Sequence, residues 1–269
     1  MSRIGSALQE LHSLELLAAR PTALQRLDPR AKLAVTLAFI LTVVSFDRYA
    51  VGALVPLAAY PVALAALGEI PAGTVRRKLL LGAPFALTLG AFNPLVDRAP
   101  VLELGGVAIA GGWVSFTSIL LRYALTVGAA VLLVAGTGFH AVCAALAGFG
   151  VPQAFTTQLL FLHRYAFVLG EEAARMSQAR ELRSSGRRAG LASYGPLVGH
   201  LLLRALDRAE RIHGAMRSRG FDGRLHTLRR LQWTPRDTLF VAGWCAFFAL
   251  ARVVDLPGRL GQVATDLLA

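Results

Sequence analysis

The sequence predicts an all-α integral membrane protein with about five transmembrane helices and a cytoplasmic module of long amphipathic helices. Three observations predict this fold class: hydrophobic residues make up 55% of the 269 residues, charged residues make up only 16%, and the apolar residues occur in long blocks. A soluble domain is about half apolar and about a quarter charged. A single soluble helical domain would have to bury several near-continuous apolar runs at once, which disfavours that alternative.

The N-terminal segment precedes the first apolar block and carries Glu10 and Glu15 among its leucines. It lacks the uninterrupted apolar core and the small-residue cleavage site of a secretory signal peptide. We therefore expect it to form an amphipathic helix that lies at the membrane surface.

Five apolar blocks follow, each near the length of about 17–25 residues with which a helix crosses a bilayer. They are Ala31–Phe46, Ala50–Gly68, Leu79–Val96, Ser115–Gly136 and Thr238–Val254. A sixth span at residues 153–170 remains an alternative, although His163 and Arg164 disfavour a lipid-exposed helix there. Between the third and fourth blocks, the glycine-rich stretch Asp97–Gly112 is expected to form a turn or a small hairpin.

Small and charged residues inside the spans carry further expectations. Gly82, Gly90, Gly128 and Ala129 would let neighbouring helices approach closely, with ordinary membrane-helix composition as the alternative explanation. Arg122 is an exception to the apolar character of the fourth span. A charge at such a depth is costly, so Arg122 is either functional, or snorkels to the interface, or pairs at a subunit contact.

Basic residues predict the orientation of the chain, because cytoplasmic loops carry an excess of Lys and Arg. With the five spans above, 23 of the 28 Lys and Arg residues fall on one side of the membrane, where Lys32 at the edge of the first span is counted on that side. We therefore expect a multi-pass protein of the cell inner membrane with a cytoplasmic N-terminus. Residues 1–139 would form an N-terminal membrane domain, residues 140–237 a cytoplasmic module, and residues 238–269 a C-terminal membrane helix and tail.

The predicted cytoplasmic module contains two long amphipathic helices. In the first, residues 153–185, apolar side chains such as Leu159 and Leu162 recur every three or four positions. The second begins near Tyr194, has Leu201 and Leu206 among its apolar side chains, and is expected to stop at a glycine. Both helices become rich in arginine toward their C-terminal ends, where the helix dipole favours positive charge.

Three kinds of partner are candidates for these arginines. Nucleic acid is disfavoured, because the segment lacks a recognised binding motif and interleaved aromatic residues. Anionic lipid headgroups account for part of the charge. Docking onto a soluble protein fits the remainder, since arginine makes planar bidentate bonds to carboxylates.

An enzyme is disfavoured by the lack of a catalytic motif. The six histidines form no HExxH pattern, and neither GxSxG nor a P-loop is present. Cys143 and Cys245 lie in apolar surroundings without metal-ligand spacing, so no metal site is predicted. A self-sufficient permease is also poorly supported, because the spans contain few polar groups.

Three stretches carry a resemblance to a known family. They are LDPRAKLAVTLAF at 27–39, FLHRYAFVLGEEAARMSQARELR at 161–183 and RAERIHGAMRSRGFDG at 208–223. The sequence resembles the transmembrane (T) component of energy-coupling factor transporters, the CbiQ/EcfT family, and most closely its cobalt/nickel branch. The resemblance extends over nearly the whole chain, and its third stretch is the most specific.

The resemblance implies a non-catalytic coupling subunit of an ATP-driven importer, which binds no cofactor itself. It would join a substrate-binding membrane protein (an S component similar to CbiM) to two ABC-type ATPases that bind the ATP. The implied ATPase-docking residues are Ala179, Arg180 and Glu181, with Arg183 as a rival to Arg180, and Ser218, Arg219 and Gly220. The residues expected to contact the S component are Leu159, Leu162, Leu201 and Leu206. A vitamin importer of the same type is the first alternative, and a membrane enzyme or self-sufficient permease is the second.

Overall fold

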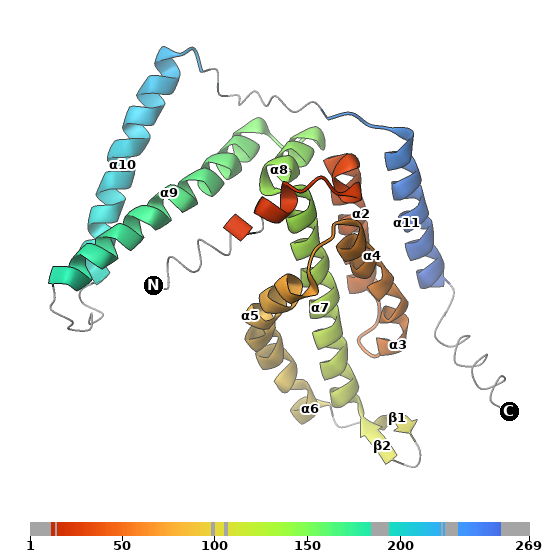
Figure 1. The fold of residues 1–269 in the computed structure, drawn as a ribbon. Coiled ribbons are helices and arrows are strands. Elements are labelled where there is room, and N and C mark those ends of the chain that lie inside the picture. Colours follow the sequence, from red (N-terminus) through yellow and green to blue (C-terminus); the bar gives the residue numbers. More distant parts are fainter. Residues whose placement is uncertain are drawn as a thin grey trace. The chain divides into compact units, whose positions relative to one another are not determined.

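The computed structural model describes residues 12–13, 15–97, 100–104, 107–183, 194–221, 223 and 231–253. They are mainly helical (Figure 1) and belong to two compact units. The first unit comprises Met1–Leu16 and Phe139–Arg230, and the second comprises Leu17–Gly138 and Leu231–Ala269.

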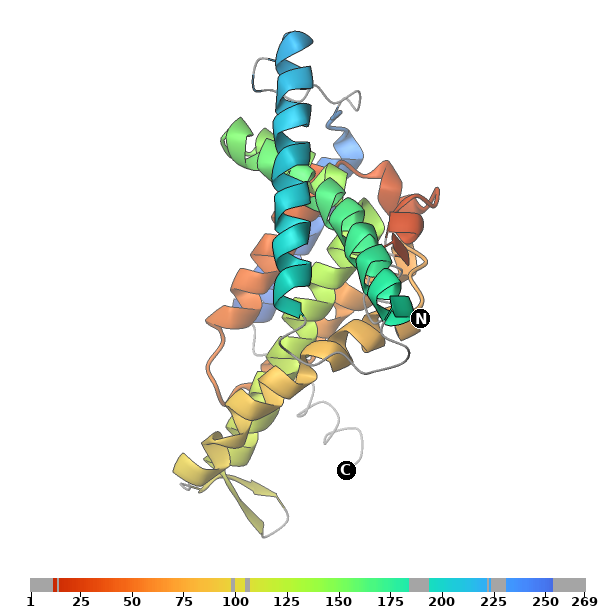
Figure 2. The same ribbon diagram turned by 90° about the vertical axis from the view of Figure 1, so that its left-hand side faces the viewer.

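The second unit contains most of the helices and is built around α7 (Gly111–Thr137). Its other elements are η1 (Ala23–Arg26), α2 (Pro29–Ser45), α3 (Val51–Leu54), η2 (Pro56–Ala58), α4 (Ala59–Leu67), α5 (Ala72–Ala91), α6 (Asn93–Val96), β1 (Pro100–Leu104), β2 (Val107–Ala110) and α11 (Pro235–Val253). Helices α2 to α6 all pack against α7, and α11 packs against α2. Both views show α5 running beside α7, with the hairpin at the end of this pair (Figures 1 and 2).

The predicted helical class is confirmed for most of the described chain, with the addition of one hairpin. Strands β1 and β2 pair in an antiparallel arrangement within the stretch for which a turn or small hairpin was expected. Among the described residues, α7 is the one helix that is long and apolar enough, by length and composition alone, to cross a membrane. Helix α2 has 17 residues, which is the lower end of the range of about 17–25 for a span, and the apolar segment Val51–Leu67 is equally short. The number of spans therefore stays a prediction.

An aromatic cluster forms the core between α2, α4 and α11. Phe39 and Tyr60 are fully buried, and their ring centroids lie 4.8 Å apart. Phe248 of α11 packs against both rings, at 5.6 Å from Phe39 and 5.5 Å from Tyr60. The Tyr60 hydroxyl lies 2.7 Å from the hydroxyl of buried Thr36, so its polar end is satisfied inside the protein. This cluster joins α11 to α2 and α4, which lie far from it in the sequence.

The LDPR stretch starts α2 by ordinary capping chemistry. Pro29 occupies the first helical turn, and the Asp28 carboxylate accepts a hydrogen bond of 2.8 Å from the Arg30 N–H. The Asp28 N–H in turn donates to Asp237 Oδ1 at the start of α11, at 2.7 Å. Lys32, only 1% exposed, lies near enough to interact electrostatically with Asp237. The motif that supports the resemblance is therefore a structural junction between α2 and α11.

Arg122 stabilises the end of α2 from its position on α7. Its guanidinium donates to the carbonyl oxygens of Phe46 at 2.8 Å and Asp47 at 2.5 Å. Its Nε donates to Ser118 Oγ at 3.2 Å. A helix leaves its last carbonyls without intrahelical partners. A cation there also interacts favourably with the negative end of the helix dipole. The described contacts thus give Arg122 a structural role within this chain.

The close approach of α5 and α7 depends on glycine at two of the four predicted positions. A Cβ at Gly90 would lie 2.6 Å from the Phe116 ring, and a Cβ at Gly82 would lie 2.3 Å from the Tyr123 hydroxyl. At Gly128 an added Cβ would meet nothing within 4 Å. Packing therefore explains Gly82 and Gly90, whereas no such contact explains Gly128.

Replacement of Gly90 by alanine is expected to destabilise the α5–α7 contact. Overpacking typically costs about 1–3 kcal/mol, which exceeds the gain of about 0.5–1 kcal/mol that alanine brings to a helix. Gly128→Ala is the matched control and should be neutral or slightly stabilising. Thermal unfolding in detergent compares the two variants, and a Gly90→Ala protein at least as stable as Gly128→Ala would contradict the packing explanation.

Candidate partner-docking site

The first unit consists largely of three helices: α8 (Phe139–Gly148), α9 (Gln153–Arg183) and α10 (Tyr194–Ser218). Helix α9 packs against both α8 and α10. With 31 and 25 residues, α9 and α10 are long and extend well beyond their shared contact (Figures 1 and 2). The predicted assignment of this segment to a cytoplasmic module stays a prediction.

Charged side chains link α9 and α10. The Glu172 carboxylate of α9 pairs with Arg204 of α10 and also with Arg175, whose Nη2 lies 3.1 Å away on its own helix. The hydrogen bonds from Arg175 and Arg204 lower the pKa of Glu172 below its ordinary value. Glu172 therefore remains ionised at neutral pH, and it links the two helices whenever it is charged.

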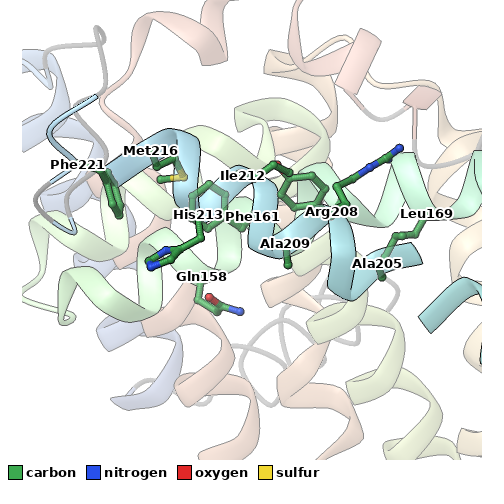
Figure 3. Close-up of a pocket in the computed structure, with 11 residues that line it drawn as sticks. Gln158, Phe161, Leu169, Ala205, Arg208, Ala209, Ile212, His213, Met216 and Phe221 are labelled. Atoms are coloured by element: carbon green, nitrogen blue, oxygen red, sulfur yellow. The ribbon is translucent and has the colours of Figure 1, made fainter. Parts of the chain in front are cut away.

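An apolar cavity of about 330 Å³ lies between α9 and α10 (Figure 3). Its lining residues are Gln158, Phe161, Tyr165 and Leu169 from α9, Ala205, Arg208, Ala209, Ile212, His213 and Met216 from α10, and Phe221 beyond α10. Phe161, Tyr165 and Leu169 follow one another at four-residue intervals and so share one face of α9. Such a cavity can accept an apolar side chain from a partner.

The second predicted docking motif lies at the C-terminal end of α10. Gly220 has a φ of +76°, a left-handed conformation that favours glycine. The Gly220 N–H donates to the Arg217 carbonyl and the Phe221 N–H donates to the Met216 carbonyl, each at 3.0 Å. This is a Schellman motif, with the accompanying apolar pair Met216 and Phe221 in the wall of the cavity. The glycine thus ends the helix and fixes the backbone next to Arg219.

Arg219 is the C-cap residue of α10, and it is exposed to solvent. Within the described part of the chain, its guanidinium makes no hydrogen bond or ion pair. Ser218, the last helical residue, donates its hydroxyl to the Gly214 carbonyl at 3.0 Å. The motif therefore presents one exposed arginine from a backbone that its neighbours hold in a defined geometry.

The first predicted docking motif lies in the last turns of α9. Ala179 and Glu181 are exposed, whereas Arg180 is half-buried. The Arg180 guanidinium carbon lies 6.0 Å from the centroid of the Tyr194 ring at the start of α10. Its rival Arg183 is the exposed last residue of α9. Arg180 is thus held against its own chain, and the choice between the two arginines stays open.

The four leucines predicted to contact an S component lie outside the cavity wall. Leu162 and Leu206 are exposed, whereas Leu159 and Leu201 are half-buried. The aromatic residues Phe161 and Phe221, which line the cavity, were not among the predicted site residues. The sequence alone gives little reason to single them out. Phe221 lies beyond the end of α10, outside its helical periodicity, and Phe161 is next to a leucine that is equally apolar.

A family model for the cobalt transport protein CbiQ matches residues 21–228 of this chain. The chain belongs to this family. The description of this family, and the name of its curated member below, are those of transport proteins. The predicted family resemblance is confirmed.

Curated relatives match parts of the chain. The cobalt transport protein CbiQ of Rhodobacter capsulatus is 36% identical over 80 residues, which is 29% of this chain and 33% of that protein. Two uncharacterised proteins of Methanocaldococcus jannaschii are 32% identical over 84 residues and 28% identical over 124 residues. These matches cover 30% and 45% of this chain, and 31% and 42% of the relatives. The chain thus spans between about a third and two fifths of the relatives it matches.

Proposed function

We propose that this chain is the transmembrane coupling subunit of an ATP-driven importer of the energy-coupling factor type, with cobalt or nickel ions as cargo. The observation that carries the proposal is the exposed Arg219 on the Schellman-capped end of α10, in a chain of the cobalt transport family. The chain would link an S component similar to CbiM to two cytoplasmic ATPases, which bind and hydrolyse the ATP.

Arg219 suits docking because its helix end is fixed and its guanidinium is exposed. A planar guanidinium makes two parallel hydrogen bonds to one carboxylate, which gives both strength and orientation. A carboxylate in a groove of an ATPase subunit is therefore the partner that we assign to it. The second contact would come from the end of α9, through Arg180 or through Arg183.

The contact between α9 and α10 would let movement at one helix end reach the rest of the module. Glu172 links the two helices through Arg204, and Arg180 lies over Tyr194 where α9 ends and α10 begins. Closure of the two ATPases on ATP would therefore move α9 and α10 together. Their exposed apolar side chains, including Leu162 and Leu206, would transmit that movement to the S component.

The orientation proposed for the chain follows from its charge asymmetry. The arginine-rich helix ends would lie in the cytoplasm, where the ATPases are, and the apolar helices of the second unit would cross the inner membrane. Exposed apolar side chains on α2, α5 and α11, such as Leu41, Leu81 and Leu239, support burial of these helices in lipid or against a second membrane protein.

Co-purification tests the proposal directly. The tagged chain is co-expressed with the proteins encoded beside it, solubilised in detergent, purified, and the retained chains are identified by mass spectrometry. We expect two ATPase chains and a small multispan membrane protein. Purification of the chain without ATPases, under conditions in which those ATPases are expressed and folded, would contradict the coupling role.

A further inference from the structure

Three side chains with metal-ligand chemistry lie together in the first unit: Glu15, His140 at the start of α8, and His163 in α9. One ligand atom of each, a carboxylate oxygen and two imidazole nitrogens, lies within 4.8 Å of the other two. Glu15 Oε1 is 3.1 Å from His163 Nε2. These residues come from three segments of the chain, so no short sequence motif could reveal them.

Aromatic neighbours fix the orientation of the central histidine. The His163 ring stacks on Phe139 with centroids 4.4 Å apart and planes 9° from parallel. Phe167 packs its ring against His163 at 5.2 Å, and the His140 ring lies perpendicular at 5.3 Å. The His163 side chain is only 16% exposed, so its ring has little room to reorient. A ligand held in this way has little orientation to lose on binding.

The spacing of the three ligand atoms is close to that of a coordination shell. Ligands bound at about 2.0–2.2 Å from one ion lie about 3.0–3.5 Å apart at neighbouring positions. The distance of 3.1 Å between Glu15 and His163 already falls in this range. The widest separation, at most 4.8 Å, can close by rotation of the long Glu15 side chain and of exposed His140.

The donor set indicates which ions fit. Two imidazoles and one carboxylate suit divalent ions such as Co²⁺, Ni²⁺ and Zn²⁺, whereas Mg²⁺ and Ca²⁺ prefer oxygen ligands throughout. The two-histidine, one-carboxylate set also leaves coordination positions for water. The close pair of Glu15 and His163 alone would not explain why the second imidazole lies within 4.8 Å of both ligand atoms.

We propose that Glu15, His140 and His163 form a binding site for one divalent transition-metal ion. The bound ion would tie the N-terminal segment to α8 and to α9, the helix that carries the first docking motif. In the orientation proposed above, the site faces the cytoplasm, so it would respond to imported ions instead of carrying them across the membrane. The site itself does not depend on the coupling function.

Metal titration of the full chain tests the site. Tag-free protein in detergent is stripped with a chelator and titrated with Co²⁺ by calorimetry, while the visible absorption of Co²⁺ reports nitrogen and oxygen coordination. We expect one equivalent of Co²⁺ per chain. Glu15→Gln keeps a hydrogen-bonding partner for His163 but removes the anionic ligand, and His140→Ala removes an exposed ligand. Each variant should weaken Co²⁺ binding about tenfold or more.

His200→Ala is the matched control, because His200 is an exposed histidine of α10 outside the cluster. It should bind Co²⁺ as the unmodified chain does. Thermal unfolding of each metal-free variant verifies that the protein is folded. An unmodified chain that binds no stoichiometric Co²⁺ would leave only the Glu15–His163 pair and overturn the proposal. Equal Co²⁺ affinity in Glu15→Gln, His140→Ala and the unmodified chain would overturn it as well.

Discussion

Replacement of Arg219 by alanine is expected to weaken ATPase binding by about 30-fold or more, and to abolish ATP-driven uptake of the metal ion, while leaving the chain folded. Loss of one partner from a docked, charge-assisted pair costs about 2–5 kcal/mol, much of which is the cost of leaving the other charge buried and unpaired. Within the described chain Arg219 makes no side-chain hydrogen bond, so its removal should not disturb the fold. Co-purification and vesicle uptake measure the two effects.

Two further variants separate docking from bulk charge. Arg211→Ala removes an exposed arginine from the same helix two turns earlier, so it changes the net charge equally and should keep ATPase binding. Arg219→Lys keeps the charge but lacks the planar fork, and should recover only part of the affinity. If Arg211→Ala weakened binding as much as Arg219→Ala, the arginines would act as a diffuse positive surface, and the specific role assigned to Arg219 would be wrong.

Helix ends were the features that the sequence predicted best. The arginine and glycine at 219–220 indicated a helix stop, and the structure ends α10 at Ser218 with Gly220 in the left-handed conformation. Local chemistry decides this feature, because a positive φ favours glycine whatever packs around it. The hairpin between α6 and α7 was predictable for the same reason.

Features formed by distant residues could not be predicted from one sequence. Asp237 accepts a hydrogen bond from the Asp28 N–H, and His163 lies close to His140 and Glu15. Both arrangements arise from tertiary packing. Arg122 shows the same limit. From its position in an apolar helix, it could be a functional residue, snorkel to the membrane interface, or pair at a subunit contact. Only the fold reveals that the end of α2 lies within reach of its guanidinium.

The number of membrane spans is also a property that local patterns leave open. Hydropathy marks α2, α5 and α11 as apolar, but several of these helices are short or carry charges near their ends. Exposed Phe85 and Leu239 can face lipid or a partner protein equally well. A transport subunit that packs against a second membrane protein needs both kinds of surface, so exposure alone does not separate them.

Replacement of Asp237 by alanine is expected to destabilise the second unit by about 2–4 kcal/mol, because it removes the acceptor of three hydrogen bonds at once. Asp237 is 0% exposed. Its Oδ1 accepts from the Asp28 N–H at 2.7 Å, and its Oδ2 accepts from the Thr234 N–H at 2.8 Å and from the Thr234 hydroxyl at 2.7 Å. The variant would also remove a carboxylate charge that interacts with the buried ammonium of Lys32.

Thermal unfolding in detergent measures this loss, and hydrogen exchange locates it. Faster exchange is expected at the first turns of α2 and α11, because the hydrogen bond between residues 28 and 237 joins these two helix starts. Asp207→Ala, at an exposed position of α10, is the control for the loss of a carboxylate and should unfold as the unmodified chain does. An Asp237→Ala protein with unchanged stability would show that the α2–α11 junction depends on the aromatic packing of Phe39, Tyr60 and Phe248 and not on its hydrogen bonds.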